Sequence, residues 1–228
     1  MDERRRLSFG GVADLYHRSR PSYPEALVDG VLEFAGAGES DRAVEVGAGT
    51  GKATVLFAAR GLDVVGIEPS AEMAQLARRN CAGYENVTIE EIEFERWRPP
   101  GHEFRLVLSA QAWHWIAPEV RYVAARAALE DGGALAAFWN RPEWIACDLR
   151  EQLAGASGFD AAEVRRYPWH QEYTTADYLA LLGTHSACVV LDAPERERLL
   201  GDIAAAIDAR GGRFRMTYAT VLCLARAS

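Results

Sequence analysis

The sequence has few cysteines, no long apolar run and no stretch of biased composition. Its cysteines form no C-x-x-C pair and have no histidine at a zinc-ligand spacing, so they indicate neither a metal knuckle nor a thioredoxin-type site. We expect buried thiols at Cys81, Cys147, Cys188 and Cys223. No stretch of about 18 apolar residues occurs, and charges occupy residues 1–6, where a signal peptide needs apolar side chains. The sequence therefore predicts a cytoplasmic protein with no metal and no membrane partner.

The sequence has fewer positively charged than negatively charged residues. The chain has 25 Lys and Arg residues against 33 Asp and Glu residues, which gives a net charge of −8 at pH 7. This sign disfavours a phosphate backbone or an anionic membrane as the main partner, because both would repel the protein. A small-molecule ligand remains the default. With 228 residues, 49% of them hydrophobic, the chain can bury a core without disulfides or a structural metal.

Short β-branched runs alternate with helical stretches rich in Ala, Leu and Arg, the pattern of a parallel sheet with crossover helices. Strands are predicted over residues 42–46, 63–67, 86–89 or 86–91, 104–109, 134–139, 162–174 and 213–225. Helices are predicted over residues 24–34, 53–60, 71–80, 118–130, 175–182 and 194–210. Neither a repeat nor a low-complexity linker interrupts this order, so we expect one continuous α/β domain.

Residues 44–51 read V-E-V-G-A-G-T-G and stand between a predicted strand and a predicted helix. A glycine-rich turn at this point lets a ligand lie against bare backbone at the carboxyl edge of a sheet. Lys52 stands where a dinucleotide fingerprint needs its third glycine, and Ala53 stands where a P-loop needs the Ser or Thr that holds magnesium. The loop therefore indicates a nucleotide-like cofactor while matching neither of those patterns well.

The segment resembles the acidic-x-G-x-G-x-G motif of the class I S-adenosylmethionine-dependent methyltransferases, which residues 45–51 fit without a gap. In that family an acidic residue at the end of the second strand binds both ribose hydroxyls, and Glu68 stands there. An acidic residue and its neighbour after the third strand bind adenine, and Glu93 and Phe94 occupy that place, with Glu91 or Glu95 as alternatives to Glu93. The resemblance covers residues 9–140 well.

The motif Y-x-x-x-R-P-x-Y-P at residues 16–24 looks like the lid of small-molecule members of methyltransferase type 11/25, such as the trans-aconitate methyltransferase group. The resemblance implies a Rossmann-like seven-stranded sheet, mostly parallel with an antiparallel last strand, and helices on both faces. It also implies a single domain over residues 1–228: a lid and first helix at 1–35, a cofactor-binding half at 41–140 and an acceptor-side half at 141–228.

The resemblance implies S-adenosylmethionine as cofactor, with S-adenosylhomocysteine as its product. The residues that would bind it are Tyr16, Arg20, Glu45, Gly47, Ala48, Gly49, Thr50, Gly51, Glu68, Pro69, Met73, Glu93, Phe94, Ser109 and Gln111. Trp113 and Trp115 would contact the acceptor, and His114 is the candidate general base. Tyr16 and Arg20 lie four residues apart and would share a helix face, where they could also serve only to pin the N-terminal segment.

The expected function is methyl transfer to a small-molecule acceptor at O, C or N, by a monomer or a homodimer. A nucleic-acid methyltransferase is an alternative, but the [DNS]-P-P-[YFW] element of enzymes that act on base amino groups is absent, since residues 109–112 read S-A-Q-A. An NAD-dependent oxidoreductase is disfavoured by Lys52. A non-catalytic accessory protein that binds the cofactor is the remaining alternative.

Overall fold

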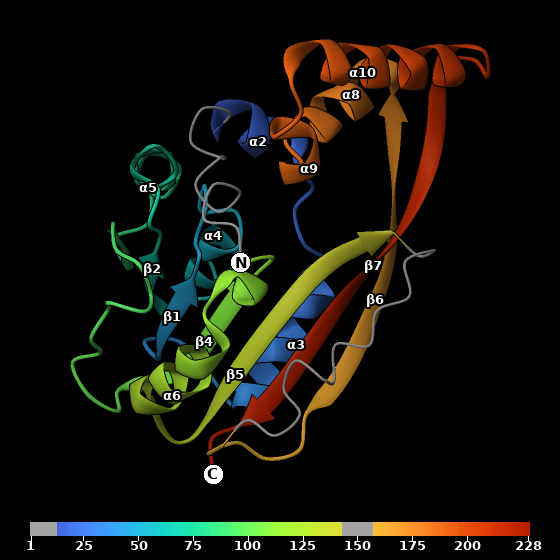
Figure 1. The fold of residues 1–228 in the computed structure, drawn as a ribbon. Helices are drawn as coiled ribbons and strands as arrows, with labels where there is room; N and C mark the ends of the chain where they lie inside the picture. Colours follow the sequence, from blue (N-terminus) through green and yellow to red (C-terminus); the bar gives the residue numbers. More distant parts are fainter. Residues whose placement is uncertain (1–12, 143–156) are drawn as a thin grey trace.

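The computed structural model describes residues 13–142 and 157–228 (Figure 1). Its centre is a seven-stranded sheet with the strand order β3-β2-β1-β4-β5-β7-β6. The strands are β1 (Arg42–Val46), β2 (Asp63–Ile67), β3 (Val87–Glu90), β4 (Phe104–Ala110), β5 (Leu129–Pro142), β6 (Glu163–Thr174) and β7 (Arg213–Arg226). Strands β1 to β5 are parallel, β7 pairs antiparallel with β5, and β6 pairs antiparallel with β7. The predicted Rossmann-like fold with its antiparallel last strand is confirmed.

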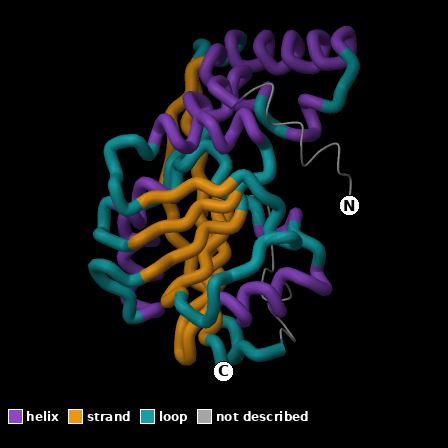
Figure 2. Tube along the Cα trace, turned by 90° about the vertical axis from the view of Figure 1, so that its left-hand side faces the viewer, coloured by secondary structure: helices purple, strands orange, loops and turns teal. Residues whose placement is uncertain are grey.

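Helices cover both faces of this sheet (Figure 2). They are α2 (Ala13–Ser19), α3 (Glu25–Ala35), α4 (Thr54–Ala58), α5 (Ala71–Asn80), α6 (Pro118–Ala128), α8 (Thr175–Gly183), α9 (Ser186–Val189) and α10 (Ala193–Asp208), with a 3₁₀ turn, η2, at Trp113–Trp115. Capping interactions fix the ends of two of these helices. Ser70 caps α5 by accepting from the backbone N–H of Met73, and Gly36 ends α3 in the left-handed conformation.

The period of two along β5 divides the core between the two faces of the sheet. Leu135, Ala137 and Trp139 are buried on one face together with residues of α6. Ala136 and Phe138 are buried on the other face together with residues of α3 and α4. This alternation continues to the end of β5. The strand therefore presents different side chains to the two faces at the edge where a ligand would bind.

The ends of several helices and strands differ from the predicted ends, because the local sequence pattern does not show where a neighbouring element begins. The helix predicted over residues 118–130 ends at Ala128, because β5 already begins at Leu129 and pairs there with Phe104. Residues 130–133 form an irregularity in this strand before the register resumes at Ala134. Helix α4 is shorter than the predicted 53–60, and α2 and α9 were not predicted as elements because neither is long enough to show a helical period.

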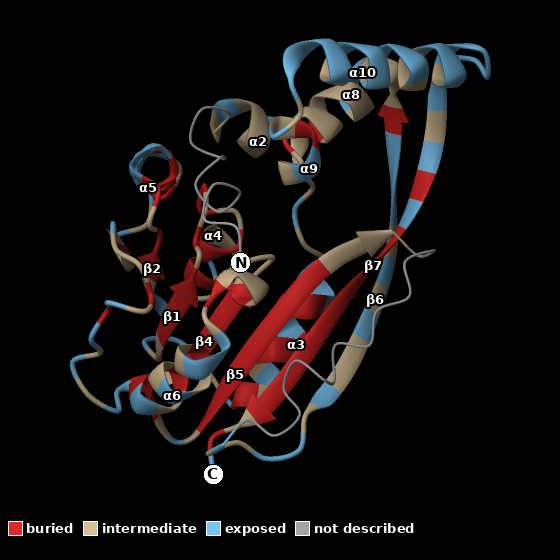
Figure 3. Ribbon diagram, in the orientation of Figure 1, coloured by how far each residue is buried: buried red, intermediate tan, exposed pale blue. Residues whose placement is uncertain are grey.

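Strands β6 and β7 form a long hairpin whose upper part carries α8, α9 and α10 (Figure 1). The lower part of β7 belongs to the main core, whereas exposed and partly buried residues dominate β6, the upper end of β7 and α10 (Figure 3). A separate aromatic cluster holds the upper part together, with Tyr173, Leu181, Met216 and Tyr218 buried in it. The hairpin thus places a second layer of residues above the carboxyl edge of the sheet.

Two predictions from the composition can be compared directly with the fold. Cys81, Cys188 and Cys223 are buried and form no disulfide, as predicted, and Cys147 lies outside the described residues. Among the helices within 13–142 and 157–228, none is long and apolar enough to cross a membrane. The division of the chain into a lid, a cofactor half and an acceptor half stays a prediction.

Candidate functional site

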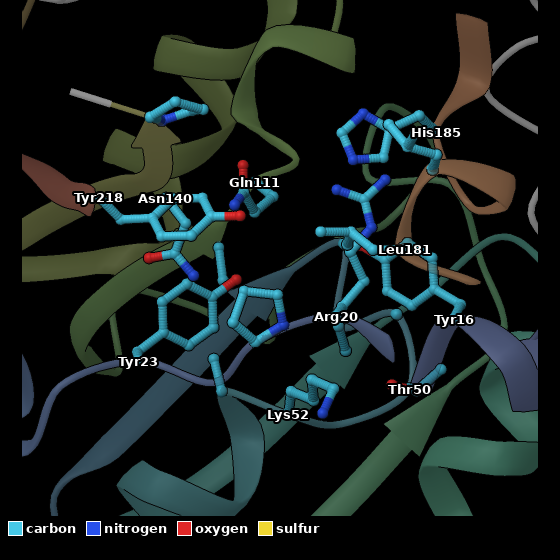
Figure 4. Close-up of a pocket in the computed structure, with 18 of the residues that line it drawn as sticks. Tyr16, Arg20, Tyr23, Thr50, Lys52, Gln111, Asn140, Leu181, His185 and Tyr218 are labelled. Carbon is cyan, nitrogen blue, oxygen red and sulfur yellow. The ribbon is translucent and has the colours of Figure 1, made fainter. Parts of the chain in front are cut away.

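Two cavities open where β1, β2, β4 and β5 end. The larger has about 1460 Å³, open solvent at its mouth included, and extends from Glu68 after β2 to Trp115 after β4. The smaller has about 810 Å³ and lies toward Tyr23 and the hairpin residues Tyr178 and Tyr218 (Figure 4). The two cavities share lining residues from the N-terminal segment, the glycine loop and the loops after β4, β5 and α8. These shared residues are Tyr16, Arg20, Gly47, Gly49, Ala110, Gln111, Asn140, Pro142 and His185.

The three glycines of the loop after β1 have different roles, although all have positive φ (73°, 58° and 81°). A Cβ on Gly47 would lie 2.3 Å from the Cβ of Ala112, and one on Gly51 would lie 3.0 Å from Cys81 Sγ. A Cβ on Gly49 would meet nothing within 4 Å. Gly49 therefore borders the cavity. Gly51 allows the loop to pack against α5 and lines neither cavity, and its contact with the cofactor stays a prediction.

Glu68 holds the glycine loop in place. Its Oε2 accepts a hydrogen bond from the Gly49 backbone N–H at 2.9 Å, and its Oε1 accepts one from the Ser70 backbone N–H at 2.9 Å. The side chain is 8% exposed and lines the larger cavity beside Pro69 and Met73. A carboxylate offers about four acceptor positions, more than the two that these backbone N–H groups occupy. Glu68 is thus both a structural residue and a candidate ribose ligand.

Glu45 is buried beneath the loop, and Thr54 Oγ1 donates to its Oε2 at 2.6 Å. Burial, followed by the nearby negative charge of Glu68, raises the pKa of Glu45 to about 8, although the hydrogen bond from Thr54 opposes this. The Glu45 carboxyl is therefore mostly neutral at pH 7. It lines the smaller cavity together with Ala48 and Thr50.

Helix α2 covers the loop and brings Tyr16 and Arg20 to the cavities. The Arg20 guanidinium lies 5.0 Å from the centre of the Tyr16 ring, so the two residues do share a face. Arg20 Nε donates to Thr184 Oγ1 at 2.9 Å, and its Nη2 donates to the Thr184 carbonyl at 3.0 Å. The pinning role that was the alternative for this pair is present in the structure. His17 Nδ1 and Thr50 Oγ1, which are 3.0 Å apart, add a second contact.

Lys52 follows the loop and lines the smaller cavity. It lies near Thr50 at the base of the close-up in Figure 4. The side chain is partly buried, and this burial lowers the pKa of its ammonium group. Lys52 is also the only lysine in the sequence. The loop thus carries a partly desolvated amine on the side facing the smaller cavity.

His114 lies between two tryptophans on the wall of the larger cavity. Its ring centroid is 4.8 Å from that of Trp115 and 6.4 Å from that of Trp139. Trp139 Nε1 donates a hydrogen bond to His114 Nδ1 at 3.2 Å. Burial, then the charges of Arg141 and Arg121, lowers the pKa of His114 to about 4. The ring is therefore a weaker base than an ordinary imidazole, and its Nδ1 already accepts the indole N–H, so the general-base role stays a prediction.

Trp113 is fully buried and lines neither cavity, so the prediction that it contacts the acceptor is wrong. It packs with Phe94 and Tyr122 beneath the sheet face that carries α6. Trp115, two positions later in the same turn, does line the larger cavity. In a 3₁₀ turn, residues i and i+2 point in different directions, and the sequence alone does not say which of two tryptophans faces inward.

Of two further predicted cofactor contacts, Ser109 is corrected by its full burial, while the contact of Glu93 stays a prediction. Ser109 is fully buried, and its hydroxyl donates to the Val46 carbonyl at 2.8 Å, so it joins β4 to β1 instead of facing a cavity. Glu93 forms an ion pair with Arg96 at 3.1 Å and lines neither cavity. Its neighbour Phe94 does line the larger cavity.

The residues that sequence reasoning missed stand mainly at the end of β5 and on the hairpin. Arg141 lines the larger cavity, Asn140 lines both, and Tyr218 lines the smaller one. Asn140 Oδ1 accepts from Thr220 and its Nδ2 donates to the Ser22 carbonyl. The rule that ligands bind at carboxyl ends of parallel strands could have found Asn140 and Arg141, which follow the predicted strand 134–139. No comparable signal marked the hairpin residues.

The site residues fit S-adenosylmethionine. Open space over Gly49 leaves room for a ligand against the backbone, and the Glu68 carboxylate lines the cavity beside it. Pro69, Met73 and Phe94 supply an apolar wall next to Glu68, as expected for an adenosine. Gln111, which has φ 65°, lies on the shared wall beyond the loop. The contacts of each residue with the cofactor stay predictions.

Comparisons with known proteins agree with this reading. Residues 43–133 match the methyltransferase domain family. An uncharacterized methyltransferase of Mycobacterium bovis is 30% identical over 210 residues, which cover 85% of this chain and 83% of that protein. The solved structure of a candidate type II methyltransferase from Anaeromyxobacter dehalogenans is 22% identical, with a TM-score of 0.70 and coverage of 91% and 97%.

The structure of a phosphoethanolamine N-methyltransferase from Haemonchus contortus, solved with phosphomonomethylethanolamine and S-adenosylhomocysteine, has a TM-score of 0.62 at 14% identity. It covers 96% of this chain and 57% of that one, and it shows the fold alone. The resemblance to the trans-aconitate group stays a prediction. From the glycine loop, Glu68 and the methyltransferase relative that matches over most of both chains, we conclude that the chain belongs to the class I S-adenosylmethionine-dependent methyltransferases.

Proposed function

We propose that the protein transfers a methyl group from S-adenosylmethionine to a small organic acceptor bound in the larger cavity. The observation that carries this proposal is the continuity of that cavity from Glu68 to Trp115 and Trp139. One end offers a carboxylate for a ribose, and the other offers two indole rings and an imidazole. A cavity of this kind can hold a donor and a small, partly apolar acceptor side by side.

The charge of the molecule supports a small acceptor over a nucleic acid. The net charge is −8, and the turn after β4 lacks the Pro-Pro element of enzymes that methylate base amino groups. Helix α2 and the loop after α8 also cover the site, through Arg20 and Thr184. A duplex could reach this cavity only if these elements moved away.

The chain's contribution to catalysis would be alignment and exclusion of water. S-adenosylmethionine supplies a methyl group already activated by its sulfonium charge. Glu68 and the Gly49 backbone would fix the donor, while Trp115 and Trp139 would fix the acceptor on the same side of the sheet. Holding two reactants in line removes much of the entropic barrier. The indole faces also suit a cationic sulfonium, at about 0.5–2 kcal/mol for a cation–π contact.

The test is a methyl-transfer assay with isotope-labelled S-adenosylmethionine over a panel of small acids, phenols and amines, run beside tRNA and duplex DNA. We expect labelled product only from small acceptors. Labelling of the nucleic acids alone would overturn the proposal. If S-adenosylhomocysteine binds but no acceptor is labelled, an accessory role without catalysis is favoured instead.

A further inference from the structure

Arg141 ends β5 on the wall of the larger cavity. The alternation along β5 places its side chain on the same face as Trp139, whereas Phe138 and Asn140 belong to the opposite face. Arg141 lines the larger cavity alone, whereas Asn140 lines both cavities. The Nε atom of Arg141 is buried and has no hydrogen-bond partner within the described residues. The guanidinium of Arg141 thus has an N–H donor, at Nε, that no described group accepts.

Among the residues that the structure describes, the lining of the larger cavity has no carboxylate near Arg141. Within those ranges its one acidic lining residue is Glu68, which follows β2. In the strand order β2-β1-β4-β5, three strand spacings separate the ends of β2 and β5, which is about 14 Å. Arg121, whose Nε is also buried without a partner, lies behind the wall and adds a second positive charge near His114. The described residues at this end of the cavity therefore carry positive charge and no negative charge.

His114 adds a neutral donor to the same end. The indole Nε1–H of Trp139 can only donate, so His114 Nδ1 must be the unprotonated nitrogen that accepts it at 3.2 Å. The ring proton is then on Nε2. The ring lies in the lining of the larger cavity, between the indoles of Trp115 and Trp139. Within this wall, the hydrogen bond from Trp139 fixes His114 as a donor through Nε2.

A buried N–H donor without a hydrogen-bond partner is unfavourable, and an anionic ligand group that accepts from the same guanidinium would offset that cost. We propose that the guanidinium of Arg141 and the Nε2–H of His114 bind an anionic oxygen group of the acceptor, a carboxylate or a phosphate. This inference rests on the proposed function and specifies its substrate class. The adjacent indole rings would hold the apolar body of the same molecule. The acceptor is thus an organic acid or a phosphate ester with an apolar part.

The experiment uses the full-length protein and isothermal titration calorimetry. A first titration with S-adenosylhomocysteine tests the cofactor site alone, and its failure would count against the proposed function itself. The protein saturated with S-adenosylhomocysteine is then titrated with benzoate, phenyl phosphate and benzyl alcohol. We expect saturable binding of at least one anion, with benzyl alcohol at least about tenfold weaker, as charge-assisted hydrogen bonds predict. Comparing benzoate with phenyl phosphate distinguishes a carboxylate site from a phosphate site.

Variants assign this preference to the proposed residues. Arg141→Gln should abolish the preference for the anion, Arg141→Lys should keep part of it, and His114→Phe should weaken anion binding by about tenfold. Arg210→Gln is the matched control, because it removes the same charge from an exposed site after α10. In all four variants the affinity for S-adenosylhomocysteine should stay within about twofold of the wild type.

Three results would overturn the inference. The first is that neither anion binds the saturated wild-type protein at millimolar concentration. The second is that Arg141→Gln keeps the preference for the anion. The third is that Arg141→Gln loses affinity for S-adenosylhomocysteine as strongly as for the anion, which would assign Arg141 to the carboxylate of the cofactor.

Discussion

At the scale of single residues, Glu68 has two tasks that one substitution would disturb together. Its carboxylate accepts the backbone N–H groups of Gly49 and Ser70, and it is also the candidate ribose ligand. We expect Glu68→Ala to weaken binding of S-adenosylhomocysteine about 10- to 100-fold, as loss of charge-assisted hydrogen bonds predicts. It should also lower the thermal midpoint of the protein without ligand. Calorimetry and thermal unfolding measure the two effects separately.

Glu93→Ala is the control for this prediction, because Glu93 pairs with Arg96 at the surface and lines neither cavity. Its affinity for S-adenosylhomocysteine should change by less than about twofold, as for other surface positions. A strong loss in this variant would restore the adenine contact implied by the family resemblance. Unchanged affinity in Glu68→Ala would contradict the ribose assignment.

Gly49 and Gly51 both have positive φ but different surroundings, so alanine substitutions at the two positions should have different effects. At Gly49 an added methyl enters open space, so Gly49→Ala should cost only the backbone strain of about 1–2 kcal/mol and should abolish cofactor binding. At Gly51 the methyl meets Cys81 and Ala77, so Gly51→Ala should destabilise the fold by more than Gly49→Ala. Urea unfolding and titration with S-adenosylhomocysteine test the pair. Equal destabilisation would contradict the assigned roles.

The glycine loop and Glu68 could be predicted from sequence because backbone chemistry demands them in a fixed order along the chain. The positions of Trp113 and Trp115 could not be predicted, since both are aromatic and only the direction of a three-residue turn decides which is buried. Ser109 was misassigned for a similar reason. It stands at the predicted edge, but its hydroxyl turns to the Val46 carbonyl on the neighbouring strand.

At the scale of secondary-structure elements, α2 depends on contacts from elsewhere. It has seven residues, none of them buried, and an isolated helix of this length is unstable in water. Arg20 fixes its end to Thr184, so Arg20→Met should increase amide hydrogen exchange in residues 13–20 by about tenfold, for the loss of about 1.5 kcal/mol. The exposed Arg18→Met on the same helix is the control. Unchanged exchange in Arg20→Met would mean that other contacts hold α2.

The strand β5 shows why the acceptor side was harder to predict than the cofactor side. Its apolar run over residues 134–139 was recognised, but the polar residues that extend it to Pro142 break the apolar pattern while keeping the backbone pairing with β7. Pairing with a distant strand, which depends on tertiary contacts, thus lengthened the element beyond its local signal. Asn140 and Arg141 were missed for this reason.

At the scale of the whole molecule, Glu45 makes stability depend on pH. Its pKa is raised to about 8, so between pH 4.5 and 8 the unfolded state loses this proton while the folded state keeps it. Stability therefore falls as pH rises through this window, by about 3–5 kcal/mol from this group. The free energy of unfolding of Glu45→Gln should change less with pH between 4.5 and 8, and near pH 8 it should exceed that of the wild type. Urea unfolding at several pH values measures this, with the exposed Glu119→Gln as control.

Two histidines make the stability depend on pH in the opposite direction to Glu45. Burial lowers the pKa values of His114 and His185 to about 4, so below about pH 6.5 the unfolded state gains protons that the folded state refuses. Their contribution to stability is lost as pH falls from 6.5 to 4. Glu45→Gln should leave this acid-side loss intact. If the stability of Glu45→Gln no longer changed with pH in either the acidic or the alkaline range, the assignment of the alkaline loss to Glu45 would be contradicted.

Lys52 allows the cofactor loop to be labelled selectively. Because the sequence contains no other lysine, a reagent that acylates amines has one side chain to modify besides the terminal amine. The lowered pKa of Lys52 leaves a larger fraction of reactive free amine at neutral pH than an ordinary lysine has. We expect S-adenosylhomocysteine to slow this acylation, because Lys52 lines the cavity that shares Gly49 with the cofactor site. Peptide mapping by mass spectrometry would then report how much of the protein carries ligand, and equal labelling with and without S-adenosylhomocysteine would place Lys52 outside its reach.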